Sequence, residues 1–217
     1  MTEKNKPPKT WTHKELCDLA VKWLKRSPSN NGHGCNIAVS EVKADHSGEI
    51  PDAIGFKMSC PRSSVLVEVK TSRSDFLADK KKPHRQQEHL GMGTYRYFMC
   101  PDGLISPEEL PEKWGLLYVN NRGHIKPQTG PASTTKKYKE FKQALEDFKC
   151  KVNLENEWLL LVRLFNKVGD IEKLNEMVKG ANRQSAYWEK EYREMITKHD
   201  EIATKFYKLR NKVEDRP

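Results

Sequence analysis

Two stretches of the chain decide the fold: residues 49–55 read EIPDAIG, and residues 65–72 read VLVEVKTS. In the second stretch a valine occupies every second position, which indicates a strand with one apolar face. Glu68 and Lys70 leave the opposite face, two residues apart. Charged side chains on such a strand must be solvated, paired with each other or bound to an ion. We therefore take this face as a candidate site.

Asp52 follows a proline near the start of the preceding strand, which is expected over residues 50–57. Asp52, Glu68 and the Val69 carbonyl offer oxygen ligands of the kind that Mg²⁺ prefers, with Mn²⁺ as a substitute. Lys70 would lie beside the metal-bound water, where it orients that water or stabilises charge developing on a phosphate. The Glu-x-Lys triplet alone also fits an ordinary ion pair on a solvated strand face, and the Pro-Asp upstream favours the metal site.

The rest of the first part of the chain predicts an α/β fold with a mixed sheet flanked by helices. A helix over residues 12–26 begins with capping-box spacing between Thr12 and Glu15. The other strands are expected over residues 35–42, 65–69, 94–100 and 115–119. The other helices are expected from residue 74 or 75 through the lysines at 80–82 as far as Pro83, over 106–110, and over 136–150, with a basic loop before the last.

The Pro-Asp and Glu-x-Lys pair, in this order of elements, resembles the PD-(D/E)xK nuclease superfamily. Residues 67–81, VEVKTSRSDFLADKK, and 95–119, YRYFMCPDGLISPEELPEKWGLLYV, are similar to the branch that includes MmcB-like DNA-repair proteins and related phage and bacterial proteins. The resemblance covers about residues 12–120. It implies a restriction-endonuclease-like fold and metal-dependent hydrolysis of phosphodiester bonds in DNA, with RNA left open as a substrate.

By that resemblance, Asp52 and Glu68 match the metal-binding acids and Lys70 the catalytic lysine. Many members add an acid from the first helix or first strand. Glu41 is the better match, because it interrupts an apolar strand face, and Glu15 is the alternative. Branch members often carry a Lys-Trp pair in the second helix, where residues 81–84 here read KKPH. The alternative function is a nucleic-acid-binding module that is catalytically weak or silent and is recruited through a coiled-coil tail over residues 151–217.

The positive charge of the chain lies mostly in its first 150 residues. The chain has 39 basic and 30 acidic residues, a net charge of +9. Residues 1–150 hold 25 basic and 18 acidic residues, a net charge of +7, and residues 151–217 hold 14 basic and 12 acidic residues, a net charge of +2. A basic domain is expected of a protein that meets a polyanion. The candidates for phosphate contacts, unless they form a solvated helix face, are Arg73, Lys80, Lys81, Lys82 and Arg85.

The last part of the chain, residues 151–217, predicts a helical segment that is separate from the domain over residues 1–150. Apolar residues alternate in steps of three and four from Ile171 to Val213, which is typical of a coiled coil and predicts a homo-oligomer. Gly180 is a possible break in this helix. The alternative is an antiparallel hairpin that folds back on the domain.

The sequence contains little that points to other classes of protein. Its longest apolar run, residues 158–162, is too short to span a bilayer, and the first ten residues lack the apolar stretch of a secretory signal. The five cysteines are scattered without a CxxC pair, so reduced thiols in a cytoplasmic protein are expected, with no clustered zinc ligands. The loop histidines His33, His84 and His89 are not expected to bind metal or act as bases.

Overall fold

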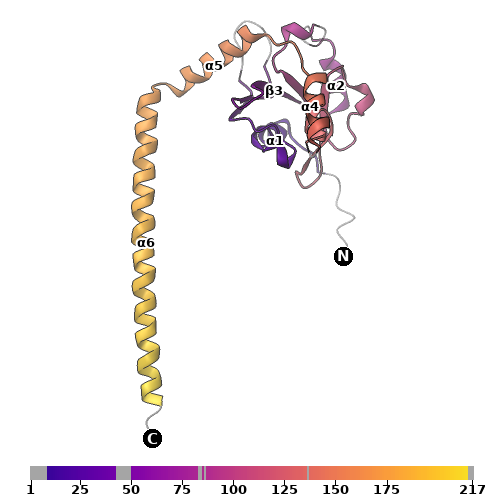
Figure 1. Ribbon diagram of the computed structural model, residues 1–217. Helices are drawn as coiled ribbons and strands as arrows, with labels where there is room; N and C mark the ends of the chain where they lie inside the picture. Colours follow the sequence, from indigo (N-terminus) through magenta and orange to yellow (C-terminus); the bar gives the residue numbers. More distant parts are fainter. Residues whose placement is uncertain (1–8, 43–49, 83–84, 86, 136, 215–217) are drawn as a thin grey trace. The chain divides into compact units, whose positions relative to one another are not determined.

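The computed structural model describes residues 9–42, 50–82, 85, 87–135 and 137–214. At its centre is a six-stranded mixed sheet with the strands in chain order (Figure 1). The strands are β1 (Ile37–Ser40), β2 (Ala53–Lys57), β3 (Ser63–Val69), β4 (Tyr95–Pro101), β5 (Trp114–Val119) and β6 (Ile125–Thr129). The central strands β3, β4 and β5 are parallel to one another, and the other neighbours are antiparallel. The expected α/β class and mixed sheet are confirmed.

Helices accompany the sheet and continue beyond it. They are α1 (His13–Lys25), α2 (Arg73–Asp79), α4 (Tyr138–Asp147), α5 (Leu154–Val168) and α6 (Ile171–Glu214). Short 3₁₀ segments lie at η2 (Pro28–Asn30), η3 (Glu88–Leu90), η4 (Pro107–Glu109) and η5 (Pro131–Ser133). None of the helices in the described ranges combines the length and apolar character that a membrane crossing requires.

The capping box predicted at the start of the first helix is present. The Thr12 hydroxyl accepts from the Glu15 backbone, and Glu15 accepts in return from the Thr12 backbone N–H at 2.9 Å. Such reciprocal bonds satisfy backbone donors that would otherwise lack a partner at the helix end. The cap therefore fixes His13 as the first residue of α1.

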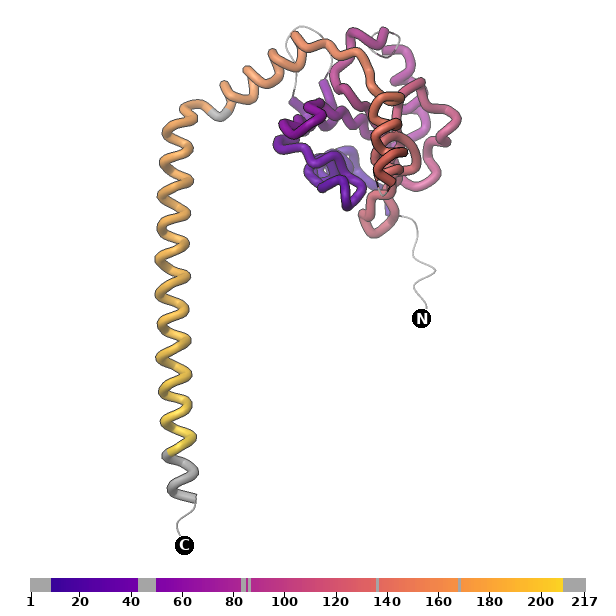
Figure 2. Tube along the Cα trace, in the orientation of Figure 1, coloured from indigo at the N-terminus to yellow at the C-terminus, as the bar shows by residue number. Residues whose placement is uncertain are grey.

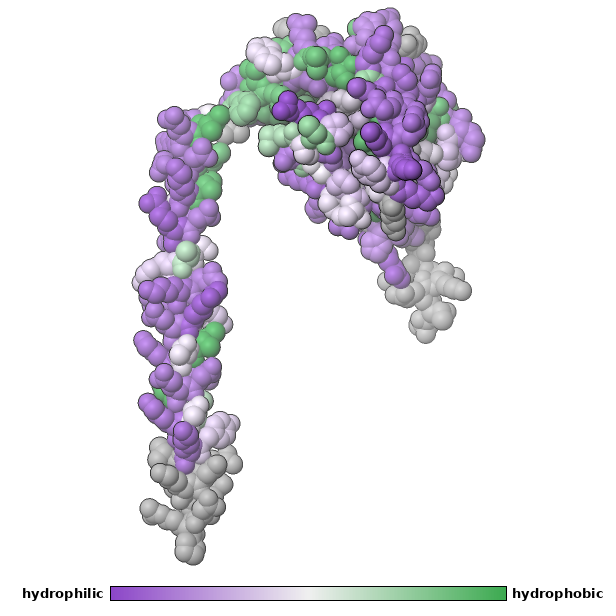
Figure 3. All heavy atoms as spheres, viewed as in Figure 1, coloured by the Kyte–Doolittle hydropathy of each residue, from purple (hydrophilic) through white to green (hydrophobic). Residues whose placement is uncertain are grey.

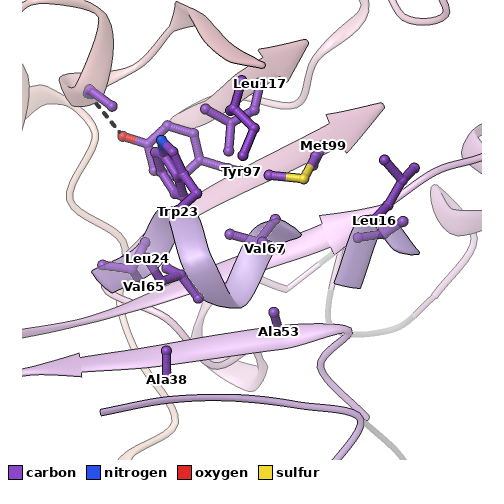
Figure 4. Packing of buried hydrophobic residues seen from close by; sticks show 14 of the residues in the cluster. Leu16, Trp23, Leu24, Ala38, Ala53, Val65, Val67, Tyr97, Met99 and Leu117 are labelled. Carbon is purple, nitrogen blue, oxygen red and sulfur yellow. Dashed lines mark hydrogen bonds between the residues drawn. The ribbon is translucent and has the colours of Figure 1, made fainter. Parts of the chain in front are cut away.

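One face of the sheet packs against α1 and α4. Val65, Val67 and Val69 are fully buried there, as the alternation predicted, together with Trp23 and Leu16 of α1. Figure 4 shows Val65 and Val67 on the strands beside Trp23 and Leu16 of the helix. Tyr97 lies next to Trp23, and its hydroxyl accepts from the Ala132 backbone N–H. This face is filled by apolar side chains and forms the larger core.

The opposite face of the sheet carries a second core. Leu66 of β3 and Phe98 of β4 are buried there against Phe76 of α2 and Leu160 of α5. Phe98 also stacks on Trp114, with ring centroids 4.4 Å apart. Because Glu68 and Lys70 leave β3 on the same side as Leu66, they enter this second layer and not the larger core.

Two expectations about secondary structure are wrong. The second helix ends at Asp79 instead of continuing through the lysines, since the backbone beyond it forms i→i+3 turns, with Lys81 and Lys82 donating to Ala78 and Asp79. Pro83, the expected end of this helix, lies outside the described residues. Part of the expected basic loop after β5 is an edge strand, β6, which tolerates Pro127 because only one side of an edge strand pairs.

The chain divides into two compact units, Met1–Leu164 and Phe165–Pro217. The first unit extends past residue 150. The physical reason is that Leu160 of α5 is buried in the second core of this unit. In the second unit α6 is one helix of 44 residues that runs through Gly180 without a break (Figure 2). The hairpin alternative is thus wrong within Ile171–Glu214. Figure 3 shows hydrophobic side chains along one edge of α6.

Candidate active site

The pairing of the first three strands places the three predicted acids in one row. Ser40 of β1 faces Ala53 of β2, and Ala53 faces Val67 of β3. One residue beyond these pairs, the Glu41 N–H donates to the Asp52 carbonyl at 3.2 Å. Asp52 precedes the pair of Ala53 with Val67 by one residue, and Glu68 follows it by one residue. Glu41, Asp52 and Glu68 therefore occupy successive positions where β1 ends, β2 begins and β3 approaches its end.

Asp52, the middle acid of the row, is held by the neighbouring strand. Its Oδ2 accepts a hydrogen bond from the Val69 backbone N–H at 2.8 Å. Its Oδ1 lies 3.2 Å from Nε2 of His13, at the start of α1, and its side chain is 18% exposed. Asp52 is therefore oriented by two contacts while part of its carboxylate stays accessible to solvent.

Glu41, the outer acid, has an unusual backbone. Its φ angle is 53°, in the left-handed region that glycine favours, and it lies directly after the last residue of β1. Its side chain is half exposed, with Oε1 3.8 Å from His13 Nδ1. Glu15, the alternative acid, is occupied by its helix cap and by Lys9 at 2.9 Å, and these contacts lower its pKa to about 2. The acid row contains Glu41 and not Glu15.

Glu68 and Lys70 are buried beneath the α2 side of the sheet, each 2% exposed. Glu68 Oε1 lies 3.0 Å from Arg85, and Oε2 lies 3.9 Å from Lys70 Nζ. Burial raises the pKa of Glu68 to about 7, although Arg85 opposes this, and the nearby Asp52 raises it further. Ionised Glu68 is therefore only partly compensated by the surrounding protein.

Asp79, at the end of α2, is the centre of this buried network, and the sequence analysis missed it. It accepts from Lys70 Nζ at 3.1 Å and Arg85 Nε at 2.7 Å, and it lies 2.7 Å from Lys82 Nζ. Burial alone would raise the pKa of Asp79, but Arg85, Lys82 and Lys70 hold it below its ordinary value. In the sequence, Asp79 is only an acid nine residues after Lys70. Its contact with Lys70 could not be predicted without knowing that α2 packs over the sheet.

The five candidate phosphate contacts fall into two groups. Lys80 and Lys81 are exposed after the end of α2, and Lys80 Nζ lies 5.1 Å from the centre of the Phe76 ring. The remaining three form ion pairs within the protein: Arg73 with Glu109, Lys82 with Asp79, and Arg85 with Asp79 and Glu68. To contact a phosphate, each of these three side chains would have to leave its carboxylate partner or bind the carboxylate and the phosphate at the same time.

The acid row has the ligand type, but not the spacing, of a preformed site for a hard divalent cation. Carboxylate oxygens are the ligands that Mg²⁺ prefers. Among the described residues, however, Glu41, Asp52 and Glu68 do not form a group whose oxygens all lie within 4.8 Å of one another, so a shared ion would require their side chains to move. Buried Glu68 has a raised pKa, and a cation beside it would favour its ionised form. For Val69 the structure places the backbone N–H on Asp52, and the role of its carbonyl as a ligand stays a prediction.

A second group of possible ligands lies beside this row, although the sequence analysis predicted none. His13, Cys17 and Asp52 each bring one ligand atom within 4.8 Å of the others. His13 and Cys17 are four residues apart on α1, a spacing that puts two side chains on one helix face. That spacing was visible in the sequence, but the approach of Asp52 depends on the packing of α1 against the sheet.

Comparisons with known proteins assign no family. No family model and no curated protein matches the sequence. A solved structure described as a protein of unknown function from Silicibacter pomeroyi is similar, with 21% sequence identity and a TM-score of 0.39. The alignment covers 61% of this chain and 80% of that one. A likeness at this level identifies neither the fold family nor the function.

Proposed function

We propose that the protein is a metal-dependent nuclease of the PD-(D/E)xK superfamily, with a restriction-endonuclease-like domain that hydrolyses phosphodiester bonds in DNA. The observation that carries the proposal is the row Glu41–Asp52–Glu68 across three strands, with Lys70 two residues beyond the last acid. An ion pair on a solvated strand face, the simpler alternative, does not account for Glu68 and Lys70 being 2% exposed.

Each residue then has a defined task. Asp52 and Glu68, with Glu41 beside them, would hold Mg²⁺, which supplies Lewis-acid polarisation of the phosphate and activation of the attacking water. Asp79 fixes the Lys70 ammonium group by a hydrogen bond of 3.1 Å. In that position Lys70 would donate to the attacking water or to a phosphate oxygen on which charge develops. Lys80 and Lys81, which are exposed, would contact the DNA backbone.

The test is a substrate panel with a matched pair of lysine variants. Duplex, single-stranded, nicked and branched DNA and single-stranded RNA are incubated with the full chain in Mg²⁺ or Mn²⁺. We expect cleavage of at least one DNA form, abolished in Lys70→Met and retained in Lys126→Ala, which changes an exposed lysine of β6. Thermal unfolding by circular dichroism shows whether each variant is folded. Failure of the wild-type chain to cut any substrate would contradict the proposal.

One observation favours a second function, a silent nucleic-acid-binding module. Glu68 and Lys70 already have protein partners, because Arg85 lies 3.0 Å from Glu68 and Asp79 accepts from Lys70. A site closed in this way can be structural and leave binding to the exposed lysines. Salt-sensitive DNA binding that Lys70→Met does not change, without cleavage of any substrate, would support this function over the nuclease.

We also propose that α6 associates with a second copy of the chain. Its apolar side chains repeat in steps of three and four, and Leu174, Val178, Trp188 and Phe206 are each at least 44% exposed. An apolar stripe along a helix of 44 residues, about 66 Å at ~1.5 Å per residue, is longer than a monomer normally leaves uncovered. A second α6 offers a stripe of the same length and periodicity.

A further inference from the structure

We propose that His13, Cys17 and Asp52 form a binding site for Zn²⁺, separate from the acid row in its ligand chemistry although it shares Asp52. The ligand atoms of these three residues lie within 4.8 Å of one another. Imidazole and thiolate are the ligands that Zn²⁺ favours in proteins, whereas Mg²⁺ favours oxygen. The proposal concerns metal binding and does not rest on the nuclease function.

The distances match a tetrahedral ion. Zinc bonds of about 2.0 Å to nitrogen and oxygen and about 2.3 Å to sulfur place tetrahedral ligand atoms roughly 3.3 to 3.6 Å apart. His13 Nε2 lies 3.2 Å from Asp52 Oδ1 and 4.0 Å from Cys17 Sγ. Cys17 Sγ and the Asp52 carboxylate lie within 4.8 Å of each other. Side-chain movements of up to about one ångström would therefore bring all three separations to the tetrahedral values.

The other ring nitrogen of His13 lies near a carboxylate. Nδ1 is 3.5 Å from Cys17 Sγ and 3.8 Å from Glu41 Oε1, so with Nε2 on the metal a small rotation would turn the Nδ1–H to Glu41. A carboxylate in this position fixes the ring and its tautomer, and it is a regular companion of zinc-binding histidines. Glu41 would act as a positioning residue for His13. The three protein ligands leave the fourth position of a tetrahedral ion to a water molecule.

Local contacts hold the three candidate ligands in place before a metal binds. The capping box fixes the first turn of α1, and Cys17 follows His13 by four residues on the same helix face. Asp52 is held by the Val69 backbone N–H at 2.8 Å. Cys17 is buried, whereas the His13 side chain is 44% exposed, so an ion can approach from the solvent side. Metal bound here would join α1 to the sheet.

The test uses Co²⁺ as a spectroscopic probe for Zn²⁺ in the full-length chain. Co²⁺ coordinated by a thiolate gives a charge-transfer absorption that oxygen ligands do not produce. We expect this absorption to saturate at one equivalent, to disappear on adding Zn²⁺, and to be absent in Cys17→Ser and His13→Ala. Cys60→Ser, which removes an exposed cysteine, should retain it. Glu41→Ala should weaken Zn²⁺ binding about tenfold in calorimetry, because it removes the acceptor for Nδ1–H.

Thermal unfolding gives a second test of the zinc site, which remains informative if one of the variants does not fold. His13 is partly exposed, so His13→Ala should keep the wild-type thermal midpoint in metal-free buffer, and only the wild-type midpoint should rise on adding Zn²⁺. Thiolate absorption that persists in Cys17→Ser, or that is lost in Cys60→Ser, would overturn the proposal, as would a wild-type chain that shows no such absorption. Because no readout involves cleavage, an inactive protein with this absorption would refute the nuclease and keep the zinc site.

Discussion

The buried carboxyl group of Glu68 should make the stability of the protein fall as the pH rises. Burial raises its pKa from 4.5 to about 7, against the opposing effect of Arg85. A group whose pKa is higher in the folded state binds protons more tightly there than in the unfolded chain. The stabilisation that protonated Glu68 contributes to the folded state is therefore fully present below about pH 4.5 and is lost as the pH rises through about 7.

The size of the effect follows from the same two values. One pK unit corresponds to about 1.36 kcal/mol, so the change from 4.5 to about 7 corresponds to roughly 3 kcal/mol in the free energy of unfolding. The replacement Glu68→Gln keeps the shape of the side chain and removes its titration. The stability difference, wild type minus variant, should thus become less favourable to the wild type by about 2.5 kcal/mol between about pH 5 and pH 8, the part of the full effect that falls in this interval.

Urea unfolding followed by tryptophan fluorescence measures this difference at each pH. Glu109→Gln is the matched control: Arg73 lowers the pKa of Glu109 to about 2, so this half-buried acid stays ionised throughout the range. Its stability difference from the wild type should not change with pH. Parallel pH profiles for wild type and Glu68→Gln would refute the reasoning. If Glu68 is a metal ligand, adding Mg²⁺ should reduce the loss of wild-type stability with rising pH, because a bound cation favours the ionised form of Glu68.

Three further predictions concern other parts of the molecule. Asp79→Asn should lower the free energy of unfolding by about 3 kcal/mol in urea titrations, because the buried cations around it lose their shared anion; an unchanged midpoint would contradict this. The double variant Lys80→Ala/Lys81→Ala should reduce the salt dependence of DNA binding by up to about 2 in log–log slope, measured by fluorescence anisotropy; an equal slope would mean that these lysines contact no phosphate. Trp188→Glu should convert a self-associated chain to monomer in sedimentation; a variant that stays associated would contradict contact through the face that carries Trp188.

The parts of the fold that depend on near neighbours in sequence could be predicted. The cap at Thr12 and Glu15 lies within one helical turn, and the alternation in β3 lies within a single strand. Each therefore has a local signal. Glu68 and Lys70 could be placed on one strand face for the same reason, but their burial depends on α2, whose cover over the sheet is set by packing.

The features that were not predicted depend on distant partners. The role of Arg85 in phosphate binding stays a prediction, but its ion pair was not foreseen, because only the folded chain brings it within 3.0 Å of Glu68, 17 positions earlier. The end of α2 was misplaced, since the lysines after Asp79 have good helix propensity and yet enter turns beside that acid. The edge strand β6 was missed because Pro127 argues against a strand unless its edge position is known.

The left-handed backbone of Glu41 bears on how this protein would respond to selection for stability alone. A non-glycine residue at a φ of 53° is disfavoured by roughly 1 kcal/mol relative to an ordinary conformation, and glycine relieves that penalty. A thermostability screen without a functional readout should therefore enrich Glu41→Gly, although this change removes a carboxylate from the acid row. Retention of glutamate when activity is selected as well would mean that the chain keeps a conformationally unfavourable residue for its chemistry.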